Sequence, residues 1–162
     1  MRYNLIRKMD ISNGPGLRVS VFMQGCAFHC KNCFNPDTWD FNLGIEFTSD
    51  TINHILELCD NEYIKGLSIL GGEPLHPKNI EGSTKLAKKF KEKYPNKNIW
   101  LWSGFLFEDM KDKEIFKYLD VLVDGQYIDE LHSPKLKWRG SSNQRVIDVK
   151  SSLNKNKLIE LE

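Results

Sequence analysis

The sequence predicts an α/β fold with a mainly parallel sheet, and three observations support this prediction. Short strand-like segments alternate with helical patterns along the 162 residues. Glycines and polar residues follow directly after each of those segments. The chain has the length of one domain, but it is shorter than the roughly 250 residues of a closed eight-stranded α/β barrel. We therefore expect one domain over residues 1–162, with a sheet that forms a partial, open α/β barrel.

Four strands are predicted. Residues 17–22 alternate in polarity and contain β-branched valines. Residues 67–70, 99–102 and 121–123 are short apolar runs, which are typical of strands covered on both faces. Because parallel neighbours need a crossover connection, the segments between these strands are expected to form right-handed crossovers.

The first predicted helix begins at Thr48 or Ser49, either of which is a good N-cap residue. Its apolar residues fall at helical spacing and share one face: Ile52, Ile55, Leu56 and Cys59. Free cysteine packs as a small apolar residue. Cys59 is therefore expected to be a buried core thiol rather than a metal ligand.

Two more helices are expected. Residues 83–94 place Leu86, Phe90 and Tyr94 on one stripe beside a row of lysines, and Pro95 ends the pattern. A third helix is predicted over residues 106–119. Residues 150–162 are expected to form a loosely ordered tail.

The composition is that of a globular protein. Hydrophobic residues make up 40% of the chain and charged residues 28%, which excludes intrinsic disorder and collagen-like sequence. The net charge of +1 gives no whole-molecule field for nucleic acid or an anionic membrane. No apolar run is long enough to span a bilayer, and residues 1–8 lack a signal-peptide pattern. We expect a cytoplasmic protein without nucleic-acid or membrane partners.

Unusual residues follow each predicted strand. The segments are 24–26, 71–74, 103–104 and 124–125, and each of the four contains a glycine. The carboxyl ends of parallel strands share one edge of a sheet, where α/β proteins bind their ligands. The sequence therefore predicts one binding site made from these four segments.

Three cysteines lie within eight residues. Cys26, Cys30 and Cys33 have the spacing C-x3-C-x2-C, and in a reducing compartment such a cluster indicates metal ligation or redox chemistry. Thiolates suit iron–sulfur clusters and zinc. Three thiolates on a four-iron cluster leave one iron free for a substrate. The alternatives are a zinc site completed by His29, and a redox-active pair at Cys30 and Cys33.

Residues 71–74 read Gly-Gly-Glu-Pro and follow an apolar strand. They are compatible with a simple tight turn, because glycine permits unusual backbone conformations and Pro74 fixes the exit. They are also compatible with a ligand that approaches the backbone of Gly71 and Gly72 closely. In that case the carboxylate of Glu73 is able to accept a hydrogen bond from a cationic amine.

The cysteine motif and residues 71–74 together resemble the radical S-adenosylmethionine (SAM) superfamily. Within it, the chain resembles the activating proteins of anaerobic (class III) ribonucleoside-triphosphate reductase, which generate a glycyl radical. The resemblance covers most of the chain, in segments 13–16, 25–39, 71–77, 99–104, 121–125 and 138–144. Gly125 and residues 138–144 narrow it to this family.

The resemblance implies a radical SAM-type partial barrel and a set of cofactor contacts. Cys26, Cys30 and Cys33 would hold a [4Fe–4S] cluster, and the amino and carboxylate groups of SAM would chelate its open iron. Gly71, Gly72, Glu73 and Pro74 would contact the SAM amine and methionyl portion. Asn32 and Phe34 would lie near the adenine, although many radical SAM proteins have an aromatic residue where this chain has Asn32. No side chain is assigned a catalytic role, since cluster and SAM carry the chemistry.

Two protein partners are implied by the same resemblance. A flavodoxin or ferredoxin would reduce the cluster, and reductive cleavage of SAM would give a 5′-deoxyadenosyl radical. That radical would take hydrogen from a glycine of the reductase large subunit. Two alternatives remain: an activase of another glycyl-radical enzyme, such as pyruvate formate-lyase, or another small radical SAM enzyme; and a non-catalytic, zinc-stabilised interaction module.

Residues 135–157 contain seven basic residues and one acidic residue, a net charge of +6. This segment is expected to be either a solvated tail or a surface for an acidic partner, such as the reductase or the electron donor.

Several other residues have weaker signals. Ser103 and Asp124 follow strands and are expected either to line the pocket or to cap turns. The aromatic residues Trp100, Trp102 and Phe105 are expected in the core. His54 and His132 have no ligand spacing and are expected to be ordinary polar residues, whereas His76 lies close enough in sequence to residues 71–74 to face the pocket.

Overall fold

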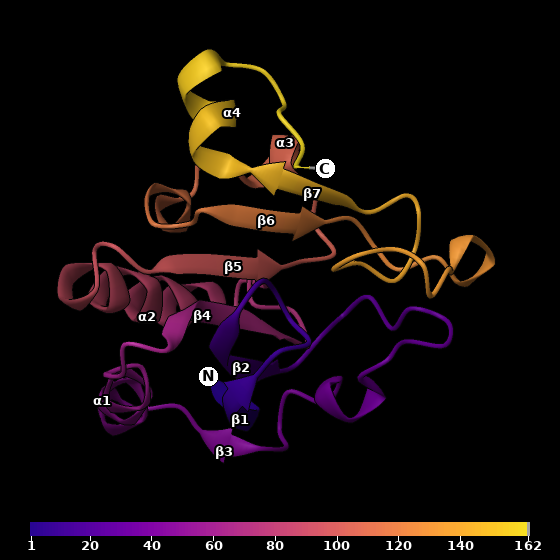
Figure 1. Cartoon of the computed structure of the whole chain (residues 1–162). Coiled ribbons are helices and arrows are strands. Elements are labelled where there is room, and N and C mark those ends of the chain that lie inside the picture. Colours follow the sequence, from indigo (N-terminus) through magenta and orange to yellow (C-terminus); the bar gives the residue numbers. More distant parts are fainter. Residues whose placement is uncertain (162) are drawn as a thin grey trace.

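A mixed seven-stranded sheet forms the centre of the computed structural model, which describes residues 1–161 (Figure 1). The strands are β1 (Arg2–Asp10), β2 (Leu17–Gln24), β3 (Ile45–Glu46), β4 (Ile64–Gly71), β5 (Asn98–Trp102), β6 (Val121–Asp124) and β7 (Arg145–Asp148). They are hydrogen-bonded in the order β3-β1-β2-β4-β5-β6-β7. The fold is therefore of the predicted α/β class.

The four predicted strands form the parallel centre of the sheet. β2 pairs with β4, β4 with β5, and β5 with β6, all in parallel. The expectation of a mainly parallel sheet is corrected by the outer strands, because β1, β3 and β7 all pair antiparallel. These outer strands gave little signal: β1 has a single buried residue, β3 has two residues, and only the two central residues of β7 are buried.

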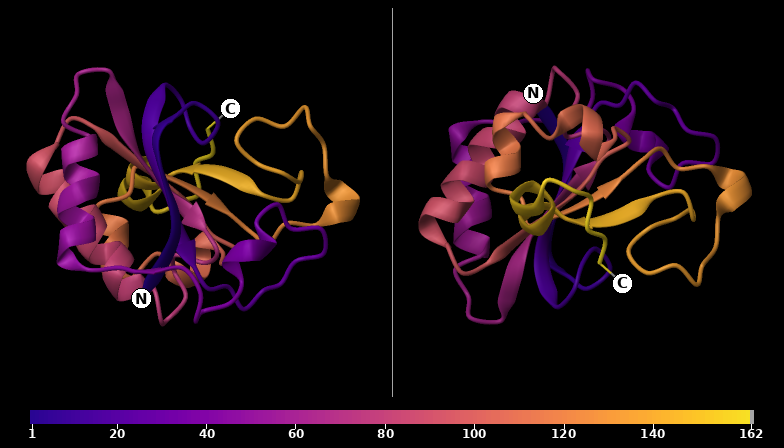
Figure 2. Two further views of the ribbon diagram at one scale, coloured as in Figure 1. Left: turned by 90° about the horizontal axis from the view of Figure 1, so that it is seen from below. Right: turned by 90° about the horizontal axis from the view of Figure 1, so that it is seen from above.

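Helices α1 (Ser49–Leu58) and α2 (Ile80–Lys93) cover one face of the sheet (Figure 2). Thr48 caps α1 as predicted, in a reciprocal pair: its backbone N–H donates to the Thr51 hydroxyl at 3.0 Å, and Thr51 N–H donates to the Thr48 hydroxyl at 3.4 Å. The predicted helix over residues 83–94 is confirmed. It begins three residues earlier, at Ile80.

The predicted helix over residues 106–119 is not continuous. The chain instead forms the short helix α3 (Phe107–Met110) and the 3₁₀ turn η2 (Glu114–Lys117). Met110 and Ile115 are both buried. In one helix, residues five apart would point about 140° away from each other. A break between them lets both side chains reach the core.

The two faces of the sheet differ in polarity. Along β2, Val19, Val21 and Met23 join the apolar core against the helices, whereas Arg18 and Ser20 are buried on the other face. Cys59 is fully buried in the core, as predicted, and burial raises its pKa to about 12. The helix-covered face therefore holds most of the apolar core.

The segment after β7 is ordered, in contrast to the loosely ordered tail that was expected. Helix α4 (Val149–Lys155) is capped by the Asp148 carboxylate, which accepts from Ser151 N–H at 3.0 Å. Beyond it, Leu161 N–H donates to the Val146 carbonyl at 2.7 Å. Helix capping and edge pairing therefore fix a segment whose composition suggested only solvent exposure.

Within the described part of the chain, no helix is both long and apolar enough to cross a membrane.

Candidate cofactor site

A cavity of about 610 Å³ lies at the carboxyl ends of the parallel strands. Its walls come from residues 25–39 (the cysteine loop), from the ends of β4 and β5, and from residues 125–144 (the β6–β7 loop). The purple and orange loops beyond the arrowheads of β5 and β6 in Figure 1 are these two loops. The volume is that of a typical small-molecule or cofactor site. The four predicted strand-end segments thus meet at one place.

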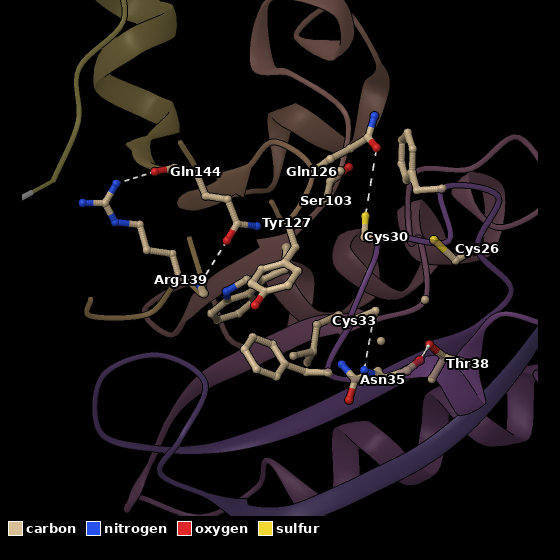
Figure 3. Close-up of a pocket in the computed structure, with 18 of the residues that line it drawn as sticks. Cys26, Cys30, Cys33, Asn35, Thr38, Ser103, Gln126, Tyr127, Arg139 and Gln144 are labelled. Carbon is tan, nitrogen blue, oxygen red and sulfur yellow. Dashed lines mark hydrogen bonds between the residues drawn. The ribbon is translucent and has the colours of Figure 1, made fainter. Parts of the chain in front are cut away.

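Cys26, Cys30 and Cys33 all line this cavity (Figure 3). The base of their loop is fixed by two backbone hydrogen bonds: Gly25 N–H to the Thr38 carbonyl at 2.6 Å, and Cys26 N–H to the Trp39 carbonyl at 3.0 Å. The turn η1 (Pro36–Thr38) closes the loop. Burial raises the pKa of the Cys26 and Cys30 thiols, so a bound metal is needed to hold them as thiolates at neutral pH.

The donor set fits an iron–sulfur cluster better than a single zinc ion. Residues 1–161 contain no group of three or more His, Cys, Asp or Glu side chains arranged to hold one metal ion. His29, the proposed fourth zinc ligand, stacks on Trp39 with ring centroids 4.4 Å apart. Three soft thiols at one cavity suit a multi-iron cluster. The indole N–H of Trp39, a cavity-lining residue, is buried without a partner among the described residues and is an unused hydrogen-bond donor.

Gly71 and Gly72 line the cavity and also pack where a side chain would not fit. Gly71 has a φ of +116°, and a Cβ there would lie 2.5 Å from the Met23 nitrogen. A Cβ on Gly72 would lie 2.5 Å from the Gly25 carbonyl oxygen. The glycines therefore let the end of β4 pack against the start of the cysteine loop, and the turn and cavity interpretations both apply.

The Glu73 carboxylate is buried at the inner wall of the cavity, with 1% exposure. Its oxygens accept from Gly104 N–H at 2.6 Å, the Ser103 hydroxyl at 2.8 Å and Leu75 N–H at 2.9 Å. Burial away from any cation raises its pKa to about 7. Glu73 thus joins the ends of β4 and β5, and its contact with the SAM amine stays a prediction. Pro74 is buried and is not one of the cavity-lining residues.

Asn32 and Phe34 contact the β6–β7 loop. Asn32, at a φ of +56°, donates to the Asp129 carboxylate at 2.8 Å and is not among the cavity-lining residues. Phe34 lines the cavity, remains 64% exposed, and packs on Tyr127 with ring centroids 5.0 Å apart. Asn32 is therefore placed to hold the two loops together, and only Phe34 is placed beside a ligand in the cavity.

The β6–β7 loop was largely missed by sequence reasoning. Gln126 lies 4.0 Å from the Cys30 sulfur, and Tyr127 and His132 line the cavity, the latter having been expected to be an ordinary polar residue. The 3₁₀ turn η3 (Asp129–Leu131) shapes this part of the loop. The sequence signals in this loop were Gly125, the resemblance at residues 138–144 and the basic residues from Lys135 onward, and none of them assigned a side chain to the cavity.

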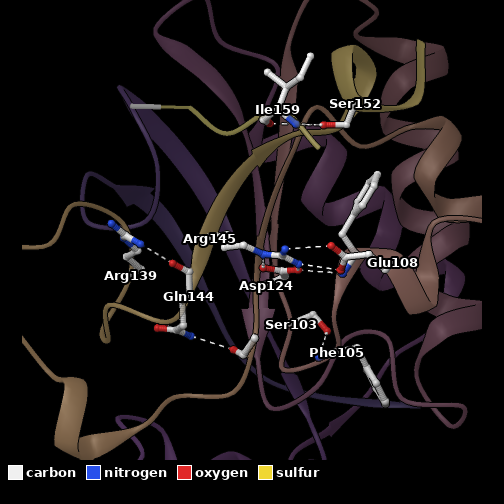
Figure 4. A network of polar contacts seen from close by, with 11 residues as sticks. Ser103, Phe105, Glu108, Asp124, Arg139, Gln144, Arg145, Ser152 and Ile159 are labelled. Carbon is white, nitrogen blue, oxygen red and sulfur yellow. Dashed lines mark hydrogen bonds and ion pairs between the residues drawn. The ribbon is translucent and has the colours of Figure 1, made fainter. Parts of the chain in front are cut away.

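Ser103 and Asp124 have different roles. Ser103 lines the cavity and holds Glu73, whereas Asp124 is fully buried and caps α3 by accepting from Phe107 N–H at 2.8 Å. Arg145 pairs with Asp124 at 2.6 Å and with Glu108 at 2.8 Å, which raises the pKa of the guanidinium (Figure 4). Asp124 thus fixes the start of the β6–β7 loop without reaching the cavity.

The remaining sequence candidates are settled by their surroundings. Trp100 is buried with Val121 and Val123, as expected for core, but Trp102 lines the cavity and donates to the Trp138 carbonyl at 2.8 Å. Phe105 packs at the edge of the core. His76 lies outside the cavity lining, where its Nδ1 accepts from Lys78 N–H at 3.0 Å. His54 lies exposed on α1.

Comparison with known families gives the class of the protein. Residues 12–147 match the family described as "4Fe-4S single cluster domain". This stretch is most of the chain and includes the three cavity-lining cysteines.

Individual relatives narrow the class further. The chain is 44% identical over 146 residues to the anaerobic ribonucleoside-triphosphate reductase-activating protein of Enterobacteria phage T4, covering 90% of this chain and 93% of the relative. It is 39% identical over 148 residues to the protein of that name from Vibrio cholerae (89% and 96%) and 38% identical over 150 residues to that from Escherichia coli K12 (90% and 97%). The chain belongs to the family of anaerobic ribonucleoside-triphosphate reductase-activating proteins.

Proposed function

We propose that this chain is a radical SAM activase that generates a glycyl radical on an anaerobic ribonucleoside-triphosphate reductase. The observation that carries the proposal is the convergence of three thiols from one loop and two glycines from the next strand end on one cavity. The family supports the reductase as partner. The cavity volume of about 610 Å³ lies within the usual range for small-molecule and cofactor sites.

In this proposal Cys26, Cys30 and Cys33 hold a [4Fe–4S] cluster, and SAM occupies the space beside it. When bound, the two supply the redox chemistry: one electron cleaves a carbon–sulfur bond of the sulfonium, and the carbon radical formed removes hydrogen from a glycine of the reductase. The side chains of this protein bind, orient and exclude water.

The positioning roles follow from the contacts of the cavity wall. Gly71 and Gly72 expose backbone to the methionyl portion of SAM, since no side chain stands in front of it. Glu73 keeps this segment in register with Ser103 and Gly104 at the end of β5. Phe28 packs edge-on against Phe105, 5.0 Å between centroids, and covers the cavity wall beside Gly104.

We extend the proposal to the fold type, the electron donor and the cellular environment. We interpret the curved parallel centre, with cofactors at its carboxyl edge, as a partial radical SAM-type barrel. The electron donor is a flavodoxin or ferredoxin, and the reaction takes place in anaerobic cytoplasm, because accessible cluster sulfur and thiolates are open to oxidation.

The test is anaerobic reconstitution followed by activation. We expect a brown protein with about four iron and four sulfide per chain. Mixed with reductant, SAM and the reductase, it should give the doublet EPR spectrum of a glycyl radical. A colourless protein holding one zinc ion would overturn the proposal. A doublet that forms on pyruvate formate-lyase but not on the reductase would keep the chemistry and change the partner.

A further inference from the structure

Two segments that are far apart in the sequence both line the cavity where it opens to the surface, which we call its mouth. The β1–β2 hairpin contributes Arg7, Ser12 and Asn13 to the lining, and residues 133–140 of the β6–β7 loop contribute the facing part. Because this opening is where a macromolecular substrate has access, its surface chemistry bears on the partner.

Arg7 and Arg139 line the cavity, and the exposed residues Lys8, Lys135 and Lys137 lie within four residues of them in the sequence. We call these five basic residues the cationic rim. Among residues 1–161, no carboxylate forms an ion pair with Lys8, Lys135, Lys137 or Arg139. Arg7 has only a long contact of 3.9 Å with Asp10.

The acidic groups nearest the rim are already engaged elsewhere. Glu73 is buried among neutral donors. Asp129 accepts from Asn32 and from the Tyr127 hydroxyl, and Glu130 lies 3.8 Å from Lys31. Asp10 accepts from Ser12, Asn13 and Ser20. Of the five rim residues only Arg7 has a carboxylate contact, the 3.9 Å contact with Asp10, so the rim carries a net positive charge.

The basic stretch at residues 135–157 divides accordingly. Arg145 forms ion pairs with Asp124 and Glu108, and Lys150 forms one with Asp120. Both residues therefore stabilise the fold. Lys135, Lys137 and Arg139 belong to the rim, whereas Lys155 and Lys157 lie at the end of α4 and after it, outside the cavity lining. The basic stretch thus contains residues that stabilise the fold, residues of the rim, and a remote part made of Lys155 and Lys157.

Exposed apolar residues follow the rim residues Arg7 and Lys8 in the β1–β2 hairpin. Met9 and Ile11 of the hairpin are 70% and 75% exposed. Exposed apolar residues beside unpaired basic residues suit a peptide segment that is both acidic and partly apolar.

We propose that the cationic rim docks an acidic segment of the reductase next to its target glycine. This inference rests on the proposed function, because the glycine must enter the cavity through the mouth that the rim surrounds. Charge complementarity at an exposed rim acts mainly on association, and salt weakens it.

The test reverses charge at the rim and, as a matched control, at the remote part of the same stretch. The rim variant is Lys135→Glu with Lys137→Glu, and the control is Lys155→Glu with Lys157→Glu. With dithionite as reductant, glycyl-radical formation is measured against reductase concentration at about 50 mM and about 300 mM salt. We expect the rim variant to need about tenfold more reductase at low salt, with a smaller difference at high salt.

A second pair makes the result independent of one loop. Lys8→Glu, on the hairpin, should behave like the rim variant, and Lys89→Glu, exposed on α2, like the control. SAM cleavage without reductase should be unchanged in all four variants, which shows that cluster and cavity are intact. Wild-type protein that cleaves SAM but forms no glycyl radical would refute the proposed function instead.

Two outcomes would overturn the docking proposal. One is equal reductase dependence in the rim and control variants. The other is a defect that appears only when a flavodoxin replaces dithionite, which would assign the rim to the electron donor.

Discussion

The two ends of the parallel strands are built from different interactions. At the amino end, Asp120 pairs with Lys91 at 2.7 Å and with Lys150 at 3.0 Å, and Lys97 donates to the Cys59 and Asn61 carbonyls. At the carboxyl end, the buried carboxylate of Glu73 has only neutral hydrogen-bond donors. The carboxylate at the amino end is held by ion pairs, whereas the carboxylate at the cavity wall has none, because the ion pairs that Arg145 makes at the carboxyl end lie at Asp124 and Glu108, outside the cavity lining.

The pKa shifts of the two carboxylates follow this difference. Lys91 and Lys150 outweigh the burial of Asp120 and lower its pKa, whereas burial dominates for Glu73 and raises its pKa to about 7. We infer that the amino end contributes stability and the carboxyl end contributes binding, the division of roles that α/β barrel enzymes also show. Substitutions at the two ends should therefore have separable effects.

The largest expected effect is on activity, from a cysteine at the carboxyl end. Cys30→Ala should reduce glycyl-radical formation more than about a hundredfold, because two thiolates hold a cluster poorly. Iron analysis and EPR measure this directly. The control is Cys59→Ala near the amino end, which should cost about 1–2 kcal/mol of unfolding free energy and keep the cluster. Loss of the cluster in the Cys59→Ala variant would contradict the inference that only the carboxyl end of the strands contributes to binding.

The next effect is on stability, at the amino end. Asp120→Asn should lower the free energy of unfolding by about 2–3 kcal/mol at neutral pH, because it leaves two lysines without their partner. Because the pKa of Asp120 is lower in the folded protein than in the unfolded chain, the unfolded chain binds a proton at Asp120 first as the pH falls. The contribution is therefore present above about pH 4 and lost below it, where variant and wild type should converge in urea titrations. Radical yield per folded molecule should not change; a large loss of activity would contradict the comparison.

The smallest effect is expected at Ser103. Ser103→Ala should cost about 1–2 kcal/mol, since its hydroxyl donates to the buried Glu73 carboxylate. Wild-type stability should fall as pH rises from about 4.5 to 7, because the folded state holds the Glu73 proton longer than the unfolded chain does. The cost of the substitution should accordingly be larger at about pH 8, where Glu73 is ionised, than at about pH 6. Anaerobic urea unfolding at both pH values checks this. If Ser103→Ala lowers the free energy of unfolding equally at the two pH values, the raised pKa of Glu73 is contradicted.

Local patterns predicted much of the fold. The strands at the sheet centre are apolar enough to be found without knowledge of their neighbours, and Thr48 is a recognisable cap. β1 and β7 were not predicted, because outer strands with few buried residues depend on pairing rather than on their own composition. The break after Met110 escaped because it is decided by which side chains the core can accept.

The site was predictable where its residues are contiguous. The three cysteines and Gly71 with Gly72 carry their signal in spacing alone. Tyr127 and Gln126 do not, because they reach the cysteine loop only after about a hundred intervening residues have folded into the sheet. Long-range contacts of this kind leave no local pattern.

The two hydrogen bonds at the base of the cysteine loop, from Gly25 and Cys26, involve only the main chain. Small zinc proteins, by contrast, lose their structure when the metal leaves. Because these hydrogen bonds need no bound group, we expect the polypeptide scaffold to stay folded when air destroys a bound cluster. Fresh iron and sulfide should then restore the protein without a round of refolding, so that such damage would call for repair rather than resynthesis.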